Sequence, residues 1–137
     1  MTDLVRTARC GCGALTAEVA GEPKLVYACA CLRCQQKSGG AFTYSAVFPE
    51  NDVRISGAHT TWPHKGDSGR NVATNFCPTC GITVFSRSDI FPDMVIVAVG
   101  CFSDPAFAPP QHVFWASRHH RWLNFPDGTE LQDTQPI

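Results

Sequence analysis

The chain has 137 residues, a hydrophobic fraction of 44% and a formal net charge of −1. This length favours a single domain over residues 1–137, with a core at about residues 4–125 and a polar C-terminal tail. The chain shows no apolar run of membrane-spanning length, no signal peptide and no basic stripe, so we expect a cytoplasmic protein without membrane or nucleic acid as a partner.

Short strands separated by turns account for most of the chain. Apolar and polar residues alternate clearly in residues 14–19, where Leu15, Ala17 and Val19 face one way and polar residues face the other. The most apolar run, residues 94–99, is rich in β-branched side chains and predicts a central buried strand. Strands are expected at residues 4–10, 14–19, 25–29, 42–48, 52–55, 59–64, 71–76, 82–86, 94–99, 112–115 and, as an edge piece, 122–125.

The connecting segments carry few helical signals. Residues 32–37 predict one short helical turn, ended by Gly39 and Gly40. Pro63 is expected to break the strand at 59–64, and the polar loop 65–69 is expected to be mobile. Residues 104–110 contain three prolines and predict an extended connection. Because no long segment has helical periodicity, the sequence predicts an all-β fold.

Three cysteines lie within six residues in the stretch C-A-C-L-R-C, at Cys29, Cys31 and Cys34. Residues two apart on an extended strand point to the same face, so Cys29 and Cys31 can present both sulfurs to one metal ion. A tetrahedral zinc ion would have three protein ligands here and a fourth position that is not supplied locally. That pattern is typical of a reactive site rather than of a closed structural one.

Four further cysteines form two pairs, Cys10 with Cys12 and Cys77 with Cys80. The second pair, C-P-T-C-G between two strands, is a zinc-ribbon signal, and together the pairs predict a four-sulfur structural zinc site. Disulfides are the alternative for these thiols, but they suit secreted chains better than a reducing compartment. Cys101 is left over, and we expect it to be a small core residue at a strand end.

The cysteine motifs resemble a known family. The chain reads C-G-C-G-A-L from Cys10, C-A-C-L-R-C from Cys29, K-S-G-G-A-F from Lys37 and F-C-P-T-C-G from Phe76. This succession is similar to the domain shared by glutathione-dependent formaldehyde-activating enzymes and centromere protein V. The resemblance implies the β-tent fold, with zinc knuckles and two zinc ions. With only three ligands supplied locally, the second ion could be labile.

The resemblance also implies roles for particular positions. The four paired cysteines match the structural zinc positions, and the triplet matches the second zinc, where glutathione or another thiol acts. The segment P-P-Q-H-V-F-W is similar to the family's late histidine-containing strand. Two positions depart from the family pattern, because Ala30 stands where a histidine is frequent and Gln35 where a basic residue is frequent. Arg33 and Lys37 are the candidates to replace the lost positive charge.

Several residues near the triplet are candidates to bind substrate. Ser38, Gly39 and Gly40 form a turn whose backbone N–H groups could cradle a carboxylate or an oxyanion. Phe42 follows that turn and could form a wall of the pocket, with core packing as the alternative. His112 lies among apolar neighbours, where it is either a hydrogen-bonded core residue or part of the site. The pair of histidines in R-H-H-R, at residues 118–121, predicts a solvated turn.

A zinc ion with three thiolate ligands is better suited to exchanging a thiolate than to ionising water. A substrate thiol bound as the fourth ligand would be a nucleophile held next to an aldehyde. The sequence therefore predicts a carbon-sulfur lyase-like enzyme, with Cys29, Cys31 and Cys34 at its catalytic centre and a small thiol or thiol-aldehyde adduct as its partner. The alternative is a non-catalytic binding module stabilised by zinc.

Overall fold

A computed structural model describes residues 4–135, so residues 1–3 and 136–137 of the predicted domain lie outside the described residues. Its strands form two sheets, one with the order β1-β2-β5 and one with the order β11-β10-β3-β4-β9-β8-β7-β6. The strands are β1 Val5–Arg9, β2 Thr16–Ala20, β3 Leu25–Cys29, β4 Thr43–Pro49, β5 Val53–Ser56, β6 Thr60–Lys65, β7 Asn71–Phe76, β8 Thr83–Ser88, β9 Met94–Ala98, β10 His112–Phe114 and β11 Glu130–Leu131.

The prediction of an all-β fold with one short helical turn is confirmed. The α-helix, α1, spans Leu32–Ser38 and ends at Gly39, which adopts a left-handed conformation (φ 66°) as the sequence predicted. Three short 3-10 helices, Glu50–Asp52, Val99–Phe102 and Ala116–Arg118, complete the described helices. Within residues 4–135, no helix is long and apolar enough to cross a membrane.

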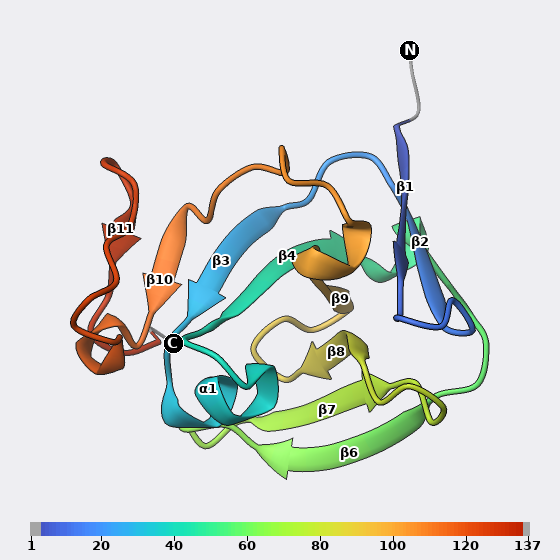
Figure 1. Ribbon diagram of the computed structural model, residues 1–137, viewed down its shortest axis with the longest axis horizontal. Helices are drawn as coiled ribbons and strands as arrows, with labels where there is room; N and C mark the ends of the chain where they lie inside the picture. Colours follow the sequence, from blue (N-terminus) through green and yellow to red (C-terminus); the bar gives the residue numbers. More distant parts are fainter. Residues whose placement is uncertain (1–3, 136–137) are drawn as a thin grey trace.

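The large sheet is curved, and α1 lies between the end of β3 and strands β6 and β7 (Figure 1). Most neighbouring strands are antiparallel, but β10 runs parallel to both β3 and β11. Strand β9 pairs with β4 on one side and β8 on the other, which agrees with the prediction of a central buried strand at residues 94–99. The curvature gives the sheet one face that packs on the small sheet and another that surrounds a hollow.

The side chains of β9 divide between these two faces by strand alternation. Val95 and Val97 are fully buried in the cluster between the two sheets, which also contains Leu15 and Phe48. Ile96 points to the other face and belongs to a second cluster. That second cluster consists of Tyr27, Cys29, Cys31, Val47, Ile96 and Phe114. The three-cysteine segment is therefore built on the face that surrounds the hollow.

Two strand predictions differ from the structure. Residues 122–125 form no strand, and Trp122 is 71% exposed, so this segment buries too little apolar surface to dock on the sheet. The chain instead adds its last strand at Glu130–Leu131, within the predicted polar tail, through pairing with β10. Pro63 does not break β6, because β6 is an edge strand and a residue that lacks an N–H group is tolerated there.

Candidate metal centres and the cavity between them

Four cysteine sulfurs from two distant turns come together at one end of the fold. Cys10 and Cys12 lie in the turn between β1 and β2, and Cys77 and Cys80 lie in the turn between β7 and β8. All four sulfurs lie within 4.8 Å of one another, and the group could hold a metal ion. We call this group the four-thiol site.

The backbone of each turn is closed by hydrogen bonds that fix the cysteine positions. In the first turn the Gly13 N–H donates to the Cys10 carbonyl (3.1 Å), and in the second the Gly81 N–H donates to the Cys77 carbonyl (2.8 Å). Both glycines have positive φ, 81° and 79°, a conformation that other residues rarely adopt. The glycine that follows each pair of cysteines is thus part of the turn geometry.

Backbone N–H groups also point at the sulfurs. The Leu15 N–H donates to Cys10 Sγ (3.3 Å), and the Thr79 N–H donates to Cys77 Sγ (3.4 Å). The bond from Leu15 is the main cause that lowers the pKa of Cys10 to about 6. These donors stabilise thiolates, the form that binds metals.

The sulfur separations fit a single ion with four ligands. Cys12 Sγ lies 3.7 Å from Cys10 Sγ and 3.6 Å from Cys77 Sγ. A tetrahedron with metal-sulfur bonds of about 2.3 Å has edges of about 3.8 Å. A disulfide would need about 2.05 Å between sulfurs, so the disulfide alternative does not describe this group.

The second group consists of Cys29 at the end of β3, Cys31 and Cys34 at the start of α1, which we call the three-thiol site. Its sulfurs also lie within 4.8 Å of one another. Cys31 is the N-cap of α1, and its sulfur accepts a hydrogen bond from the Cys34 N–H (3.3 Å). Hydrogen bonding from the Cys29 thiol, and then from Cys34, lowers the pKa of Cys31 to about 2, whereas the pKa values of Cys29 and Cys34 are raised, so Cys31 is the thiolate of the metal-free group. The group can therefore also present thiolate to a metal ion.

The three-thiol site opens into a cavity of about 510 Å³ on the concave face of the large sheet. Cys29, Cys31 and Cys34 all line it, whereas none of the four-thiol cysteines does. Gly81, Ile82 and Thr83, which follow directly after Cys80, form part of another wall. The cavity therefore extends from the three-thiol site to the turn that carries half of the four-thiol site.

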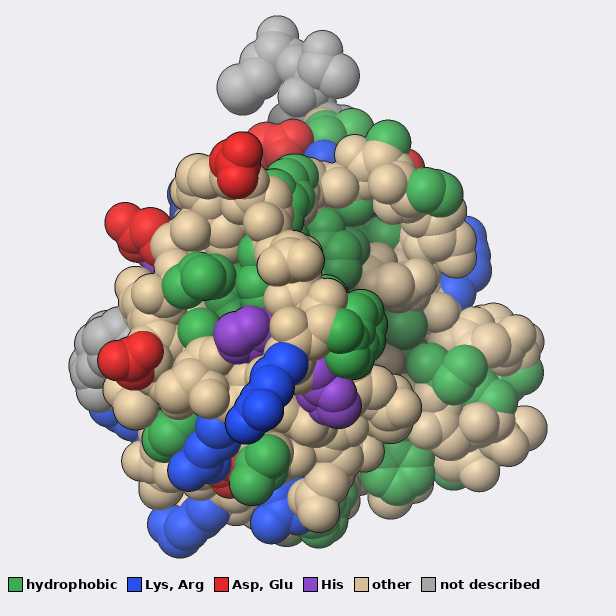
Figure 2. Space-filling view, turned by 60° about the vertical axis from the view of Figure 1, so that its left-hand side comes forward, with side chains coloured by type: hydrophobic (Ala, Val, Ile, Leu, Met, Phe, Trp, Pro, Cys, Tyr) green, Lys and Arg blue, Asp and Glu red, His purple; other side chains and the backbone are tan. Residues whose placement is uncertain are grey.

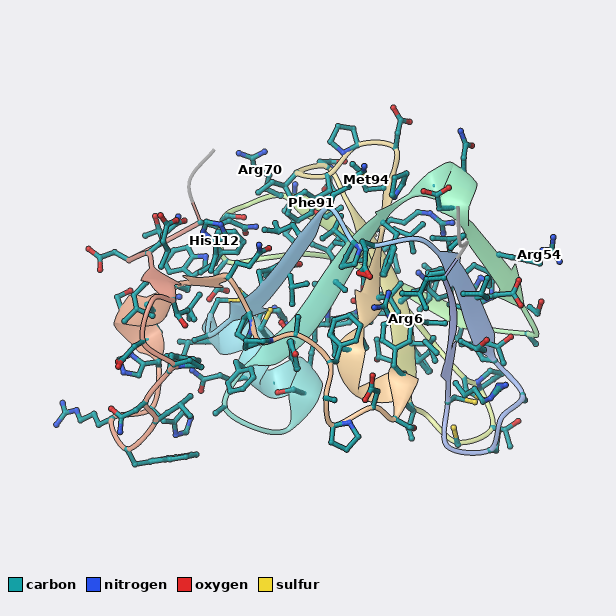
Figure 3. The ribbon with its side chains drawn as sticks, turned by 90° about the horizontal axis from the view of Figure 1, so that it is seen from above. Arg6, Arg54, Arg70, Phe91, Met94 and His112 are labelled. Carbon is teal, nitrogen blue, oxygen red and sulfur yellow. The ribbon has the colours of Figure 1, made fainter. Side chains whose placement is uncertain are left out.

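Positive charge dominates the cavity. Arg33, Lys37 and Arg70 line it, and among its described lining residues Asp67 is the one carboxylate. Burial lowers the pKa of Lys37, while the neighbouring thiols act in the opposite direction. Lys, Arg and His side chains gather in the centre and lower part of the face in Figure 2, and Arg70 points outward at the edge of the fold in Figure 3. A ligand with negative charge is favoured in such a site.

The residues predicted to bind substrate fall into two groups. Ser38 and Phe42 line the cavity, and Phe42 also packs against Phe125 with ring centroids 5.9 Å apart. Gly39 and Gly40 do not line it, because the glycine turn is occupied with ending α1: the Gly40 N–H donates to Ser38 Oγ (3.1 Å). Their predicted role as an oxyanion cradle receives no support from this placement.

His112 lies outside the cavity. Its Nδ1 lies 2.9 Å from Glu130 Oε2, and its ring borders a separate shallow hollow beside residues 126–130. The pairing of β10 with β11 brings these two side chains together. The position of His112 is therefore explained by the strand that the sequence did not predict, and its predicted role at the three-thiol site has no geometric support.

Gln35, at a position where the resemblance led us to expect a basic residue, has a structural role. Its Nε2 donates to the carbonyls of Ala30 and Arg118, both at 2.9 Å, and its Oε1 lies 3.1 Å from His120 Nε2. The side chain thus ties α1 to the segment after β10. His120, predicted to lie in a simple solvated turn, takes part in this link.

The loop predicted to be mobile is a hydrogen-bonded turn. The Gly66 N–H donates to the Arg70 carbonyl (3.0 Å), and the Gly69 N–H donates to the Gly66 carbonyl (2.9 Å). Asp67 in this loop accepts hydrogen bonds from the Leu32 N–H (3.0 Å) and from Arg118 (2.6 Å). No local pattern in the sequence indicates these contacts, since they join segments far apart in the chain.

Tyr27 is a further cavity residue that sequence reasoning missed. It lies two residues before Cys29 on β3, so strand alternation places both side chains on the same face, and this signal could have identified it. Tyr27 is buried in the same cluster as Cys29 and Cys31. Burial raises its pKa, so its hydroxyl remains a hydrogen-bond donor at neutral pH.

Cys101 belongs to neither thiol group. It lies in the 3-10 helix Val99–Phe102 rather than at a strand end, and it packs against the core between the two sheets. Its sulfur donates to the Thr83 carbonyl (3.4 Å). Burial raises the pKa of Cys101 to about 11, so it is a protonated thiol at neutral pH.

Comparison with known proteins adds three findings. Residues 5–118 match the family described as glutathione-dependent formaldehyde-activating enzyme. A Colletotrichum graminicola protein, provisionally given that same name, is 29% identical over 83 residues, which are 59% of this chain and 43% of the relative. This chain thus spans less than half of that relative's length. A crystal structure of a Rhodobacter sphaeroides protein is similar in fold, with a TM-score of 0.53, 22% identity and coverage of 75% of this chain and 91% of the other.

Proposed function

The chain belongs to the family of glutathione-dependent formaldehyde-activating enzymes, and from this premise we propose that its three-thiol site is a zinc-dependent centre for carbon-sulfur chemistry. The substrates would be a small thiol, such as glutathione, and its adducts with small aldehydes. The observation that carries the proposal is that three thiols, with no fourth ligand grouped with them among residues 4–135, lie at the wall of a positively charged cavity. The four-thiol site would hold a second, structural zinc ion.

Zinc bound by Cys29, Cys31 and Cys34 would supply a fourth ligand position at which a substrate thiol loses its proton at neutral pH. Thiol sulfur suits this ion, since thiolates are among its preferred ligands. The S-H proton leaves the thiol, a C-S bond forms to the aldehyde carbon, and the aldehyde oxygen takes up a proton. The lyase direction is the reverse of this addition.

The chain's own residues would orient the two reactants. Arg33, Lys37 and Arg70 offer positive charge to the carboxylates of a thiol such as glutathione, because they line the same cavity as the thiols. The buried Tyr27 hydroxyl is a neutral donor that can hydrogen-bond to the aldehyde or alcohol oxygen. The cavity volume of about 510 Å³ is within the range of small-molecule sites.

Cobalt substitution tests the proposed thiol site. Glutathione added to the cobalt-loaded parent should change the cobalt-thiolate absorption, whereas the Cys31→Ser variant should show no such change. Exchange NMR with 13C-labelled formaldehyde then measures whether the protein accelerates interconversion of formaldehyde and its glutathione adduct above the spontaneous rate. A spectral change without acceleration would support the non-catalytic binding module. If the three-thiol site holds cobalt and no thiol changes its absorption, the proposal is refuted.

A further inference from the structure

The side chain of Arg118 connects two segments that border the three-thiol cavity. Its Nη1 lies 2.6 Å from Asp67 Oδ2, in the loop between β6 and β7. Its guanidinium carbon lies 4.4 Å from the centre of the Trp115 ring, which lines the cavity. Trp115 has a positive φ of 55°, so its backbone alone does not favour this position. Arg118 therefore holds a cavity wall and a cavity loop at the same time.

Asp67 extends this connection to the three-thiol site. The same oxygen that contacts Arg118 also accepts a hydrogen bond from the Leu32 N–H (3.0 Å). Leu32 follows Cys31 directly and begins α1, which carries Cys34. Four residues of the loop line the cavity, namely Gly66, Asp67, Ser68 and Arg70. One carboxylate thus fixes the loop over the cavity to the backbone between two of the thiols.

The backbone of residue 118 is attached to the same region. Its carbonyl accepts a hydrogen bond from Gln35 Nε2 (2.9 Å), and that amide group also donates to the Ala30 carbonyl (2.9 Å). Residue 118 therefore holds the three-cysteine segment from both sides, through its carbonyl and Gln35 and through its guanidinium and Asp67. Two independent links between the same segments indicate a fixed arrangement rather than a chance surface ion pair.

We propose that Asp67 and Arg118 are positioning residues, which form a latch that holds loop 65–70 across the mouth of the three-thiol site and fixes Cys31 relative to Cys34. This inference rests on the proposed function of the site but concerns residues to which that function assigns no role. The latch sets how fast a metal ion leaves the site and how readily other molecules reach its sulfurs. Neither residue is a metal ligand or touches the reacting atoms.

Because the Asp67–Arg118 pair is partly exposed, its effect on the metal site can be measured separately from its effect on folding stability. The side chains of Arg118 and Asp67 are 39% and 23% exposed, and ion pairs that solvent can reach contribute little to folding. Groups that orient metal ligands have larger local effects, of about 10-fold to 100-fold on metal affinity. The latch therefore predicts variants that fold like the parent but hold the second metal less well.

The first experiment measures zinc release to a chromogenic chelator. Asp67→Asn and Arg118→Lys should each release zinc from the three-thiol site about ten times faster than the parent, with release from the four-thiol site unchanged. Glu50→Gln and Arg87→Lys are matched controls, because Arg87 pairs with Glu50 at 2.8 Å and its guanidinium lies 5.3 Å from the Phe85 ring centre. The controls should release zinc at the parent rate. Equal rates in all five proteins would overturn the latch.

A double variant tests whether the two residues act together. If they form one latch, Asp67→Asn combined with Arg118→Lys should release zinc no faster than the more affected single variant. Independent effects that multiply to about a hundredfold would contradict a shared latch. Hydrogen exchange should in addition show faster exchange at residues 65–70 in both single variants, and unchanged exchange there would count against the proposal.

A measurement with the three-thiol site empty keeps this inference separate from the proposed function. In reduced protein that keeps zinc in the four-thiol site but has lost it from the three-thiol site, an aromatic disulfide should modify Cys31 and Cys34 about ten times faster in Asp67→Asn than in the Glu50→Gln control, with sites identified by mass spectrometry. If the parent binds no thiol substrate but this difference appears, the proposed function fails and the latch stands. If the parent responds to thiols and no difference appears, the latch fails and the proposed function stands.

Discussion

The two thiol sites use the same ligand chemistry in opposite structural settings. The four-thiol site joins turns that are far apart in the chain, with Cys12 and Cys77 separated by 65 positions, and none of its cysteines lines the cavity. The three-thiol site is assembled within six residues and faces the cavity with all of its sulfurs. Ligand type therefore does not decide the role of such a site. What differs is how much chain the metal would tie together and whether a ligand position stays accessible.

The largest effect is expected from a break in the four-thiol site. Structural zinc binding can contribute about 10 to 16 kcal/mol of apparent free energy, so Cys77→Ser should prevent stable folding. Circular dichroism melts combined with zinc analysis measure this. A variant that retained a cooperative melt near the parent temperature, with its full zinc content, would show that the four-thiol site is not what holds the two turns together.

The corresponding change in the three-thiol site should leave the fold intact. Cys31→Ser removes one metal ligand, but serine can still accept the N-cap hydrogen bond that Cys31 accepts from Cys34. Because the ligands are close in sequence, losing this metal releases little loop-closure constraint. We expect a melt close to the parent and the loss of one zinc equivalent. Unfolding of this variant would remove the contrast between the two sites.

A smaller effect should follow from removing positive charge at the accessible site. Lys37→Met should weaken binding of glutathione about tenfold, which corresponds to about 1.4 kcal/mol, while binding of neutral 2-mercaptoethanol changes little. Titration of the cobalt-substituted protein measures both. Lys65→Met is the control, because Lys65 donates to Asn71 (3.1 Å) and does not line the cavity. Equal losses for both thiols would mean that Lys37 does not recognise carboxylates.

The smallest effect concerns Cys101, the thiol outside both sites. Its pKa is raised to about 11 in the folded protein, above the unfolded value of about 8.5. The folded state therefore binds more protons between these values, and this contribution to stability is present at neutral pH and lost as the pH rises from about 9 to 11. Urea unfolding of Cys101→Ala should show a smaller loss over that interval than the parent. Identical pH profiles would contradict the shift.

The sequence was sufficient to locate both thiol sites, because their signals are local. Short cysteine spacings, adjacent glycines and strand alternation can be recognised in the sequence without any knowledge of the fold. The contacts that surround the three-thiol site were harder to predict. The contact between Asp67 and Arg118 joins residues 51 positions apart, and neither residue has a local pattern that indicates its partner.

Strand β11 shows the same limit for the fold. It has two residues, and its two backbone partners on β10 define it more than its own composition does. The sequence left two positions open for His112, and its contact with Glu130, which depends on that pairing, agrees with the hydrogen-bonded one. Gln35 shows the same limit, because the sequence indicated only a lost positive charge there, and not the hydrogen bonds that its side chain makes to Ala30 and Arg118.

The wall formed by Gly81, Ile82 and Thr83 has a consequence for the order in which the protein would acquire its metals. These residues directly follow Cys80, so the turn that shapes one side of the cavity is itself organised by the four-thiol site. A chain that had filled the three-thiol site alone would lack this wall. Metal loading would then be sequential, with the four-thiol site first, and limited zinc would yield a mixture of unfolded and fully folded chains rather than molecules with an incomplete cavity.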